Sequence, residues 1–447
     1  MGSVGQRELG EDAELGVLGM GLRLGALIGP MALGVSAGGV ALPSAAVALR
    51  VDPAVSSWVL AAYGLAVGIG MALFGRLSDA RGVPGALRAG ALLLGVGALA
   101  CVGAPDVGVL VAGRLALGAG AGAVSASALA LGASLEPARR TRVLATVGAT
   151  MAFFAGTATL VGGVVTAALS WRVTMALPAL SLVGVCLCLR QAAAPAARSR
   201  GPIDVVGAGL LTVTAAALVV LIQARTLRLP APLVGAVALL APLGALGLAR
   251  RVSARPAGFV PRLLAGDRAF YIDCAIGFGM FGGYFAALYA VPQILVHDHG
   301  WSVLAVGVAL LPGALLGAAV SRAVGPVAAS LGAHRLLAAT AAAFTAALGA
   351  AGAAGVAAGF VVAAAFGFTA FGITQVTLVD RVSARIPAAH RGAAAGLLNL
   401  AFLVGGSVGS SAAGALSPSL GLSHALLVVA ALPLAAGLIA ASRPRHE

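Results

Sequence analysis

The chain has 447 residues, of which 60% are hydrophobic and only 9% are charged, and its 28 basic residues are all arginines. Soluble domains carry about a quarter charged residues and an apolar share near half, so this composition excludes an ordinary soluble fold. The formal net charge of +14 would suit a nucleic-acid-binding protein, but the arginines are dispersed between apolar runs and form no single basic patch.

Apolar runs of about twenty residues recur along the chain, and each is long enough to cross the ~30 Å hydrocarbon core of a bilayer. The runs are continuous and do not alternate with a period of two, so they predict helices and not barrel strands. We therefore expect an all-α polytopic membrane protein. The fourteen predicted transmembrane helices cover residues 24–49, 57–75, 87–104, 107–134, 143–168, 171–189, 204–223, 231–249, 270–296, 302–321, 336–354, 356–379, 393–416 and 421–441.

The arginines predict how these helices are oriented. With a cytoplasmic N-terminus, 23 of the 28 arginines fall in cytoplasmic segments, four fall outside and Arg114 lies within a span. Cytoplasmic loops of membrane proteins carry such an excess of positive charge. We expect both termini in the cytoplasm, and we interpret residues 1–23 as a short cytoplasmic tail because no cleavage site of a signal peptide precedes the first span.

Two pairs of segments repeat at an offset of 250 residues. GRLSDARG at 75–82 corresponds to GPVAASLG at 325–332, and Pro137 corresponds to Pro387. The repeat predicts two six-helix halves in the same orientation across the membrane. An inserted pair of helices crosses the membrane twice and so keeps the second half in the orientation of the first. Twelve spans, with the inserted pair on the membrane surface, are the alternative. The predicted parts are a tail (1–23), a first half (24–192), a linker (193–203), an inserted hairpin (204–249), a second linker (250–269), a second half (270–441) and a C-terminal tail (442–447).

Four stretches carry a family resemblance: GRLSDARGVPGAL, LVAGRLALGAGAG, LYAVPQILVHDHGWSVLAVGVALLPGAL and RIPAAHRGAAAGLLN with the following GGSVG. Through them the sequence resembles the major facilitator superfamily, and specifically its fourteen-span drug:proton antiporter branch, over nearly the whole chain. The matching positions are Gly75, Leu77, Asp79, Gly82, Leu87, Arg114, Gly118, Gly120, Tyr289, Pro292, Gln293, Gly300, Ser302, Gly307, Pro312, Arg391, Gly392, Gly396, Asn399, Gly405, Gly406 and Gly409.

This resemblance implies two helical halves that rock around a central substrate site, and proton-driven export of small amphipathic drugs or antibiotics. Several positions depart from the branch, and two of these departures bear on proton coupling. Gly34 stands where the branch commonly carries an aspartate, and Ala158-Thr159 stand where its antiporters carry Gly-Pro. A facilitator or importer of an organic anion without proton antiport, with Arg114 as counter-charge, therefore remains the alternative.

GRLSDARG gathers three charges in a charge-poor chain. We expect it to be a gating loop, because glycines allow close approach and a tight turn and an aspartate there can pair with a nearby arginine. The alternative is a solvated turn whose arginines only reflect the excess of positive charge in cytoplasmic loops. The gating residues are Gly75, Leu77, Asp79, Arg81 and Gly82.

Two charged residues are candidates for coupling. A cation within a span costs about 2.5–3.5 kcal/mol on insertion scales, so Arg114 is predicted to face the cavity or a partner, or else to extend to the outer interface. Asp273 is the best remaining acid for proton exchange, with an interfacial place beside Arg268 as the alternative. Asp380, next to Arg381, is interpreted as a boundary residue.

Polar residues within spans predict the lining of a broad and mostly apolar pocket, although each can equally bond between helices. The sequence contains no paired acids and no Ser/His/Asp grouping at catalytic spacing, so it does not predict an enzyme. No cofactor is implied, and the HDH segment at 297–299 offers too few donors to bind a metal. The expected partners are a small-molecule substrate, protons and the lipid bilayer of a bacterial inner membrane, with the protein as a monomer. The candidate cavity residues are Tyr63, Tyr284, Tyr289, Gln293, Gln375 and Asn399.

Overall fold

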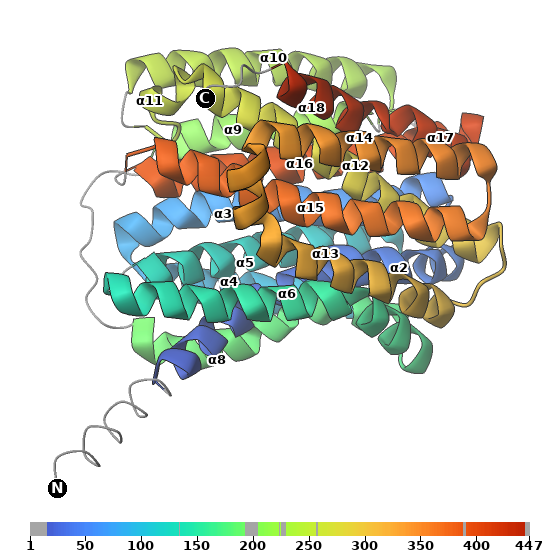
Figure 1. The fold of residues 1–447 in the computed structure, drawn as a ribbon, viewed down its shortest axis with the longest axis horizontal. Helices are drawn as coiled ribbons and strands as arrows, with labels where there is room; N and C mark the ends of the chain where they lie inside the picture. Colours follow the sequence, from blue (N-terminus) through green and yellow to red (C-terminus); the bar gives the residue numbers. More distant parts are fainter. Residues whose placement is uncertain are drawn as a thin grey trace, which may run out of the picture.

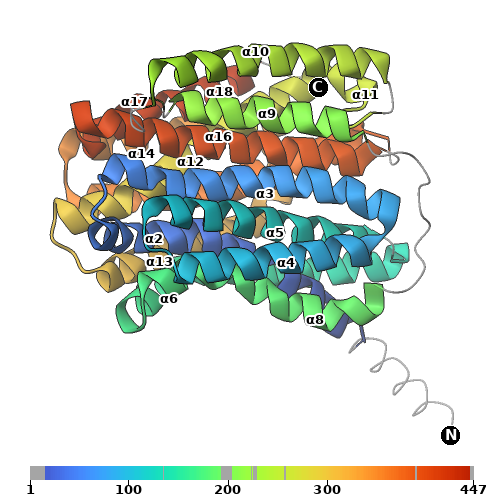
Figure 2. The same ribbon diagram turned by 180° about the vertical axis from the view of Figure 1, so that it is seen from behind.

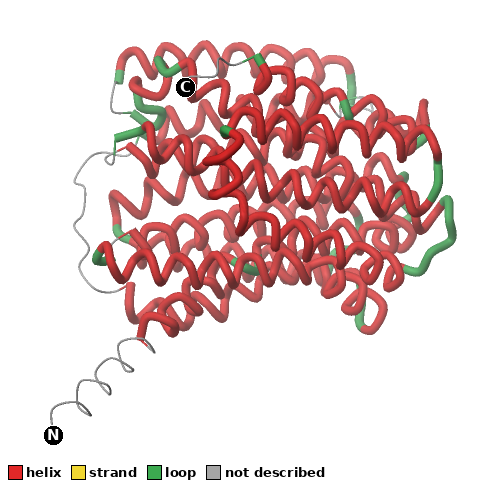
Figure 3. The backbone as a smooth tube through the Cα atoms, viewed as in Figure 1, coloured by secondary structure: helices red, strands yellow, loops and turns green. Residues whose placement is uncertain are grey.

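The computed structural model describes residues 16–133, 135–192, 204–222, 224, 229–255, 258–387 and 390–442. All regular structure in these residues is helical (Figure 3). Fourteen of the described helices are long and apolar enough to cross a membrane. The inserted pair runs alongside the other helices in Figures 1 and 2, which favours fourteen spans over twelve and confirms the predicted fold class.

The first half begins with a helix over Gly16–Ile28. It continues with α2 (Met31–Leu49), α3 (Pro53–Arg81), α4 (Val83–Val102), α5 (Val107–Ala133), α6 (Pro137–Ala168), α7 (Trp171–Ala176), the 3₁₀ helix η1 (Leu177–Leu180) and α8 (Ser181–Ala192). The inserted hairpin and its linker consist of α9 (Val205–Ile222), α10 (Ala231–Ala254) and α11 (Arg262–Ala265). The second half consists of α12 (Arg268–His297), α13 (Val303–Leu331), α14 (Ala333–Ala354), α15 (Ala357–Arg385), α16 (Arg391–Leu420), α17 (Leu422–Val429) and α18 (Ala431–Ala441).

The internal repeat is visible in the bounds of the helices. α13, α14 and α15 each begin 250 residues after α3, α4 and α5. Gly82 and Gly332 occupy the same turn in the two halves, with φ of 87° and 85°. The two halves therefore repeat one backbone path, as the 250-residue offset predicted.

Three predicted spans are interrupted helices. The first span begins by Gly16, earlier than predicted, and breaks between Ile28 and Met31 at Pro30. The sixth contains the 3₁₀ helix around Pro178, and the last breaks at Ala430, three residues before Pro433. Proline explains these breaks, because it has no N–H for the preceding turn and its ring crowds the carbonyl there.

The predicted gating loop is mostly helix. α3 continues through Arg81, so the turn is confined to Gly82, whose positive φ only glycine adopts without strain. At Gly75, in contrast, an added Cβ would lie 3.8 Å from the Cβ of Ala126, an ordinary contact. The side chains of Asp79 and Arg81 lie outside the described part of the structure. Gly75 and Gly82 therefore do not lie in the same turn.

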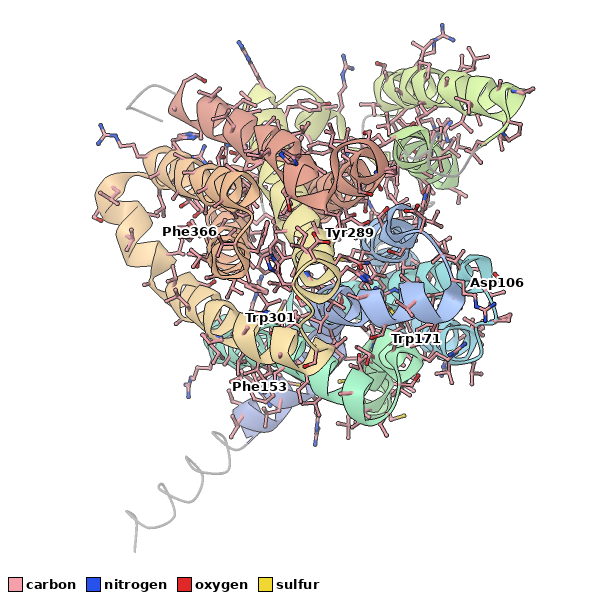
Figure 4. The ribbon with its side chains drawn as sticks, turned by 90° about the vertical axis from the view of Figure 1, so that its right-hand side faces the viewer. Asp106, Phe153, Trp171, Tyr289, Trp301 and Phe366 are labelled. Atoms are coloured by element: carbon pink, nitrogen blue, oxygen red, sulfur yellow. The ribbon has the colours of Figure 1, made fainter. Side chains whose placement is uncertain are left out.

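The two halves pack side by side, with contacts between α3 and α16, between α6 and α13, and between α2 and α12. Figure 4 looks along the helices and shows the first half in blue to green and the second in yellow to red. The hairpin lies outside this bundle, where α9 packs against α16 and α3. It therefore touches both halves from one side.

A buried carboxylate fixes the hairpin to the bundle. Asp204, only 7% exposed, forms an ion pair with Arg251 of α10 at 2.9 Å and accepts the Phe259 N–H at 3.2 Å. Arg76 of α3 donates to the carbonyls of Gly258 and Phe259 at 3.0 and 3.1 Å. The hairpin, its linker and α3 are thus joined by one polar network.

We expect Asp204→Asn to lower the free energy of unfolding by about 1–3 kcal/mol, since Arg251 would lose its charge partner. Burial raises the pKa of the Asp204 carboxyl, but its bonds from Arg251, the Gly207 N–H and the Phe259 N–H outweigh this and lower that pKa. The stabilisation is therefore present above the ordinary aspartate pKa and lost as pH falls through the depressed one. Thermal unfolding of the unmodified protein and of Asp204→Asn at pH 7, and again at a pH below the depressed pKa of Asp204, checks this, with Glu136→Gln as the control.

We expect Gly82→Ala to destabilise the protein by about 1–3 kcal/mol, because alanine cannot adopt this backbone conformation without strain. Gly75→Ala, in a helix with space for a methyl group, should leave the thermal midpoint unchanged or raise it slightly. Equal losses in both variants would contradict this account of the motif.

Candidate functional site

A cavity of about 600 Å³ lies between the two halves. α2, α3 and α6 line it from the first half, and α12, α13, α15 and α16 line it from the second. Most of its lining residues are aliphatic or aromatic. The polar ones are Ser36, Tyr63, Tyr284, Ser321, Gln375, Asp380, Ser383 and Asn399.

The cavity extends from mid-bundle towards one end of the helices. α6 lines it through residues 148–155, around the middle of that helix, and α15 lines it through residues 368–383, from near its middle to near its last residue. The last turns of α15 lie towards the turns at Gly82 and Gly332, at an end of the bundle that we call the Gly82 end. Asp380, which lines the cavity there, is exposed. The cavity therefore reaches solvent at the Gly82 end.

The opposite end is closed by contacts between the halves. Gln293 of α12 donates to the Ser56 hydroxyl of α3 at 3.2 Å. An added Cβ at Gly307 of α13 would lie 2.7 Å from the carbonyl oxygen of Thr159 of α6, so these two backbones touch. Figure 4 views the protein from this end and shows Tyr289 where the halves meet.

Four of the predicted cavity residues line the cavity: Tyr63, Tyr284, Gln375 and Asn399. The Gln375 amide donates to the Asn399 side-chain oxygen at 3.1 Å, within the second half. The hydroxyls of Tyr284 and Ser36 are 3.5 Å apart and join the two halves across the cavity. The fold thus brings residues distant in sequence into one pocket.

Tyr289 and Gln293 do not line the cavity. Both are fully buried at the closed end, where Tyr289 lies near Ser56 and Ser417 and Gln293 bonds Ser56. They follow Tyr284 on α12, about one and a half and two and a half turns nearer that end. Their polarity serves the contact between the halves.

Arg114 is fully buried and does not line the cavity. Its guanidinium donates to the carbonyls of Val59 and Met175, each at 3.2 Å, and to the carbonyl of Gly34. It also stacks on the ring of Tyr63 at 4.1 Å, and Tyr63 is the residue that faces the cavity. Arg114 therefore supports the cavity wall from behind and does not extend to the membrane interface.

The surroundings of Arg114 depend on glycine at position 34. A Cβ at Gly34 would collide with the Tyr63 ring, so no aspartate fits there in this arrangement. Among the residues that the structure describes, Arg114 has no ion-pair partner. Backbone carbonyl dipoles and one aromatic ring balance its charge instead.

Asp273 is also fully buried and lies away from the cavity. It forms ion pairs with Arg381 at 3.4 Å and with Arg385 at 3.1 Å, and Arg385 also bonds Asp267 at 3.1 Å. The predicted alternative partner, Arg268, is not part of this network. Asp273 therefore ties α12 to α15 near the Gly82 end.

Sequence reasoning missed Asp380, which was interpreted as a boundary residue. It is the only charged residue among the described ones that line the cavity. Phe368, Gly372, Val376 and Asp380 all line the cavity and recur every four positions along α15, and this spacing is the signal that could have revealed Asp380.

The family model described as Major Facilitator Superfamily matches residues 24–410. The chain is similar to a lincomycin resistance protein of Streptomyces lincolnensis, with 31% identity over 41% of this chain and 38% of that protein. It is also similar to a puromycin resistance protein of Streptomyces alboniger, with 36% identity over 30% of this chain and 27% of that protein. The chain thus spans less than two fifths of the length of these curated relatives.

Solved structures share the fold at low sequence identity. A transporter of the POT family, in complex with a thioalcohol-conjugated peptide, has a TM-score of 0.66 at 15% identity over 95% of both chains. A D-xylose–proton symporter has a TM-score of 0.62 at 16% identity, covering 94% of this chain and 97% of that one. Both likenesses concern the fold alone.

We expect Arg114→Ala to lower the free energy of unfolding by about 3 kcal/mol, because it leaves three carbonyls without their donor and the Tyr63 ring without support. Arg88→Ala, at an exposed position, removes the same charge and should have little effect. Thermal unfolding of the purified variants measures both, and equal stability would contradict a supporting role for Arg114.

Proposed function

Because this chain belongs to the Major Facilitator Superfamily, a family of membrane transporters and not of enzymes, we propose that it exports small amphipathic organic compounds across the cytoplasmic membrane by proton antiport. The observation that carries the proposal is the cavity between the halves, open at one end and closed at the other. Such a site at the interface of two repeats is where transporters of this design bind substrate.

The chemistry of the cavity supports amphipathic substrates. Its wall is mostly aliphatic and aromatic, with a few hydrogen-bonding groups such as Gln375 and Asn399. A pocket of this kind binds by burying apolar surface and orients its ligand through a few polar contacts. A sugar, with a hydroxyl on nearly every carbon, would leave most of its hydrogen bonds unmade. The resistance proteins that the chain resembles favour antibiotic-type compounds.

We propose that the Gly82 end faces the cytoplasm, as the excess of arginines in its connections predicts. The structure then corresponds to a state that accepts substrate from inside. Alternating access requires the closed contacts at Gln293 and Gly307 to separate while the Gly82 end closes. The contact includes glycines with close backbone approach and the hydrogen bond from Gln293 to Ser56, weak interactions that suit repeated opening.

The GRLSDARG segment remains our proposed gate. Its Arg76 bonds the linker carbonyls of Gly258 and Phe259, and its Gly82 forms the turn to α4. A movement of α3 would therefore also displace the inserted hairpin through these hydrogen bonds. We also propose that Arg114 and Asp273 act indirectly, by positioning Tyr63 and α15 respectively.

The organic-anion alternative loses its main argument. It assigned Arg114 as the counter-charge of the substrate, but Arg114 is enclosed behind Tyr63. Asp380, the one charged residue among the described residues of the cavity lining, would repel an anion.

Inside-out membrane vesicles test the proposed function. With the lumen made acidic, vesicles containing the protein should accumulate lincomycin or puromycin, because protons leaving the lumen drive substrate in. Vesicles without the protein, and vesicles treated with a protonophore, are the controls. Accumulation that ignores the pH gradient would exclude proton antiport, and absence of accumulation for a panel of amphipathic antibiotics would exclude drug export.

A further inference from the structure

A second hollow lies on the outside of the second half, and it shares no lining residue with the cavity between the halves. This groove has a volume of about 500 Å³ and is bounded by α12, α16 and α18. All of its lining side chains are apolar apart from the Cys274 thiol, and Ala275 and Ala435 within it are exposed. The groove is therefore open to the hydrocarbon of the bilayer.

The floor and one side of the groove are fixed by helix packing. At the floor, a Cβ added to Gly279 of α12 would lie 2.5 Å from the carbonyl oxygen of Leu432 of α18, so these two backbones touch. Phe278 lines the groove and also packs against the cluster that contains Ala215 and Val219 of α9. The groove therefore borders the place where the inserted hairpin meets the second half.

The depth of the groove corresponds to the acyl chains of one leaflet. α12 begins with Arg268 at the Gly82 end. Because a helix rises 1.5 Å per residue, Cys274 and Gly279 lie roughly 9 and 16 Å along the axis from Arg268. Half of the hydrocarbon core is about 15 Å thick. The groove thus occupies the hydrocarbon of the leaflet at the Gly82 end.

One face of α12 leads from the groove to a positive charge. Arg268, Tyr271, Ala275 and Phe278 are three or four positions apart, which is the spacing of neighbours on one helix face. Arg268 is exposed, and Tyr271 is 54% exposed. Tyrosine and arginine are the side chains that lie at the level of lipid headgroups. The mouth of the groove therefore offers a guanidinium and a phenol to a headgroup.

The positive charge at this mouth is not neutralised by the protein residues that the structure describes. Arg262, on the neighbouring α11, is exposed like Arg268, and neither forms an ion pair with a described residue. The two acids of this part of α12, Asp267 and Asp273, are engaged by Arg385 of α15. Guanidinium groups bind phosphate through charge-assisted hydrogen bonds. The pair of arginines thus favours a phosphate.

We propose that this groove binds one anionic phospholipid, with an acyl chain against Phe278 and Gly279 and the phosphate held by Arg262 and Arg268. Basic sites between transmembrane helices at the cytoplasmic side bind anionic headgroups, and the chain-deep groove adds an apolar contact to this charge. The lipid site does not depend on what the protein transports. Only the assignment of the lipid to the cytoplasmic leaflet rests on the proposed orientation.

Native mass spectrometry of the purified protein tests the headgroup. The protein in neutral detergent is titrated with phosphatidylglycerol or with phosphatidylcholine of the same acyl chains, and bound lipid is counted. We expect one phosphatidylglycerol to bind more tightly than phosphatidylcholine. Arg268→Gln should weaken phosphatidylglycerol binding about fivefold, as the loss of one arginine at a membrane surface does, and the variant with Arg262→Gln as well should weaken it further.

A matched variant separates this site from general charge. Arg88→Gln makes the same change at an exposed position at the Gly82 end of α4, outside the groove, and should leave lipid binding unchanged. Ala275→Phe fills the groove at an exposed position and leaves both arginines in place, so it should also weaken phosphatidylglycerol binding. Equal binding of the two lipids, equal losses in Arg268→Gln and Arg88→Gln, or unchanged binding in Ala275→Phe would each overturn the proposal.

Photocrosslinking of the unmodified protein locates the acyl chain without any substitution. Phosphatidylglycerol with a diazirine in its acyl chain should label residues 274–279 of α12 and 432–439 of α18. Tenfold excess of unlabelled phosphatidylglycerol should remove this labelling, and the same excess of phosphatidylcholine should leave most of it. Labelling spread evenly over the exposed helices would mean that the groove holds no particular lipid, and the proposal would be wrong.

Discussion

The structure depends on how closely helix backbones can approach one another. Lipid gives apolar helices little reason to associate, so packing between small residues provides much of the attraction. At the closed end, glycines allow such contact: a Cβ at Gly39 of α2 would lie 2.5 Å from the carbonyl oxygen of Leu288 of α12, and α6 meets α13 at Gly163 and Gly307. Towards the Gly82 end the cavity lies between the two halves.

The few charged residues within the described bundle differ in the groups that surround them. Arg114 is surrounded by backbone carbonyls and one ring, and Asp273 is held by two arginines of α15. Asp204 joins the hairpin to its linker. A buried charge without partners is costly, which explains these arrangements. Asp380 differs because it is exposed, and it forms no ion pair with another residue that the structure describes.

The inserted hairpin contacts the bundle through α9, whose Ala215 and Val219 pack against Leu65 of α3 and Leu400 of α16, and through the polar network at its Asp204 end. Elsewhere α10 is largely exposed to the surroundings, with leucines such as Leu239 and Leu243 on its outer face. The polar network of Asp204 and Arg251 therefore limits where the hairpin can sit. Through Arg76, the same network reaches the segment in which the sequence gathers its charges.

The sequence by itself determined the class of protein and the repeat, and it favoured fourteen spans over twelve. Segment length, continuous hydrophobicity and the 250-residue offset are local properties, and a bilayer restricts the chain to helices. It also indicated Tyr63, Tyr284, Gln375 and Asn399 as lining residues, since polar groups within apolar spans need a reason to be there. The interrupted helices were signalled by Pro30, Pro178 and Pro433, but a hydropathy pattern does not say which proline breaks a span.

Only the tertiary structure decided which way each charged side chain points. Arg114 and Asp273 were plausible cavity residues by their depth in the sequence, yet one lies behind Tyr63 and the other faces α15. Asp380 was plausible as a boundary residue, yet it lines the cavity. Successive helix residues point about 100° apart, so the face that meets the cavity depends on the rotation of each helix. That rotation is fixed by packing against helices hundreds of residues away.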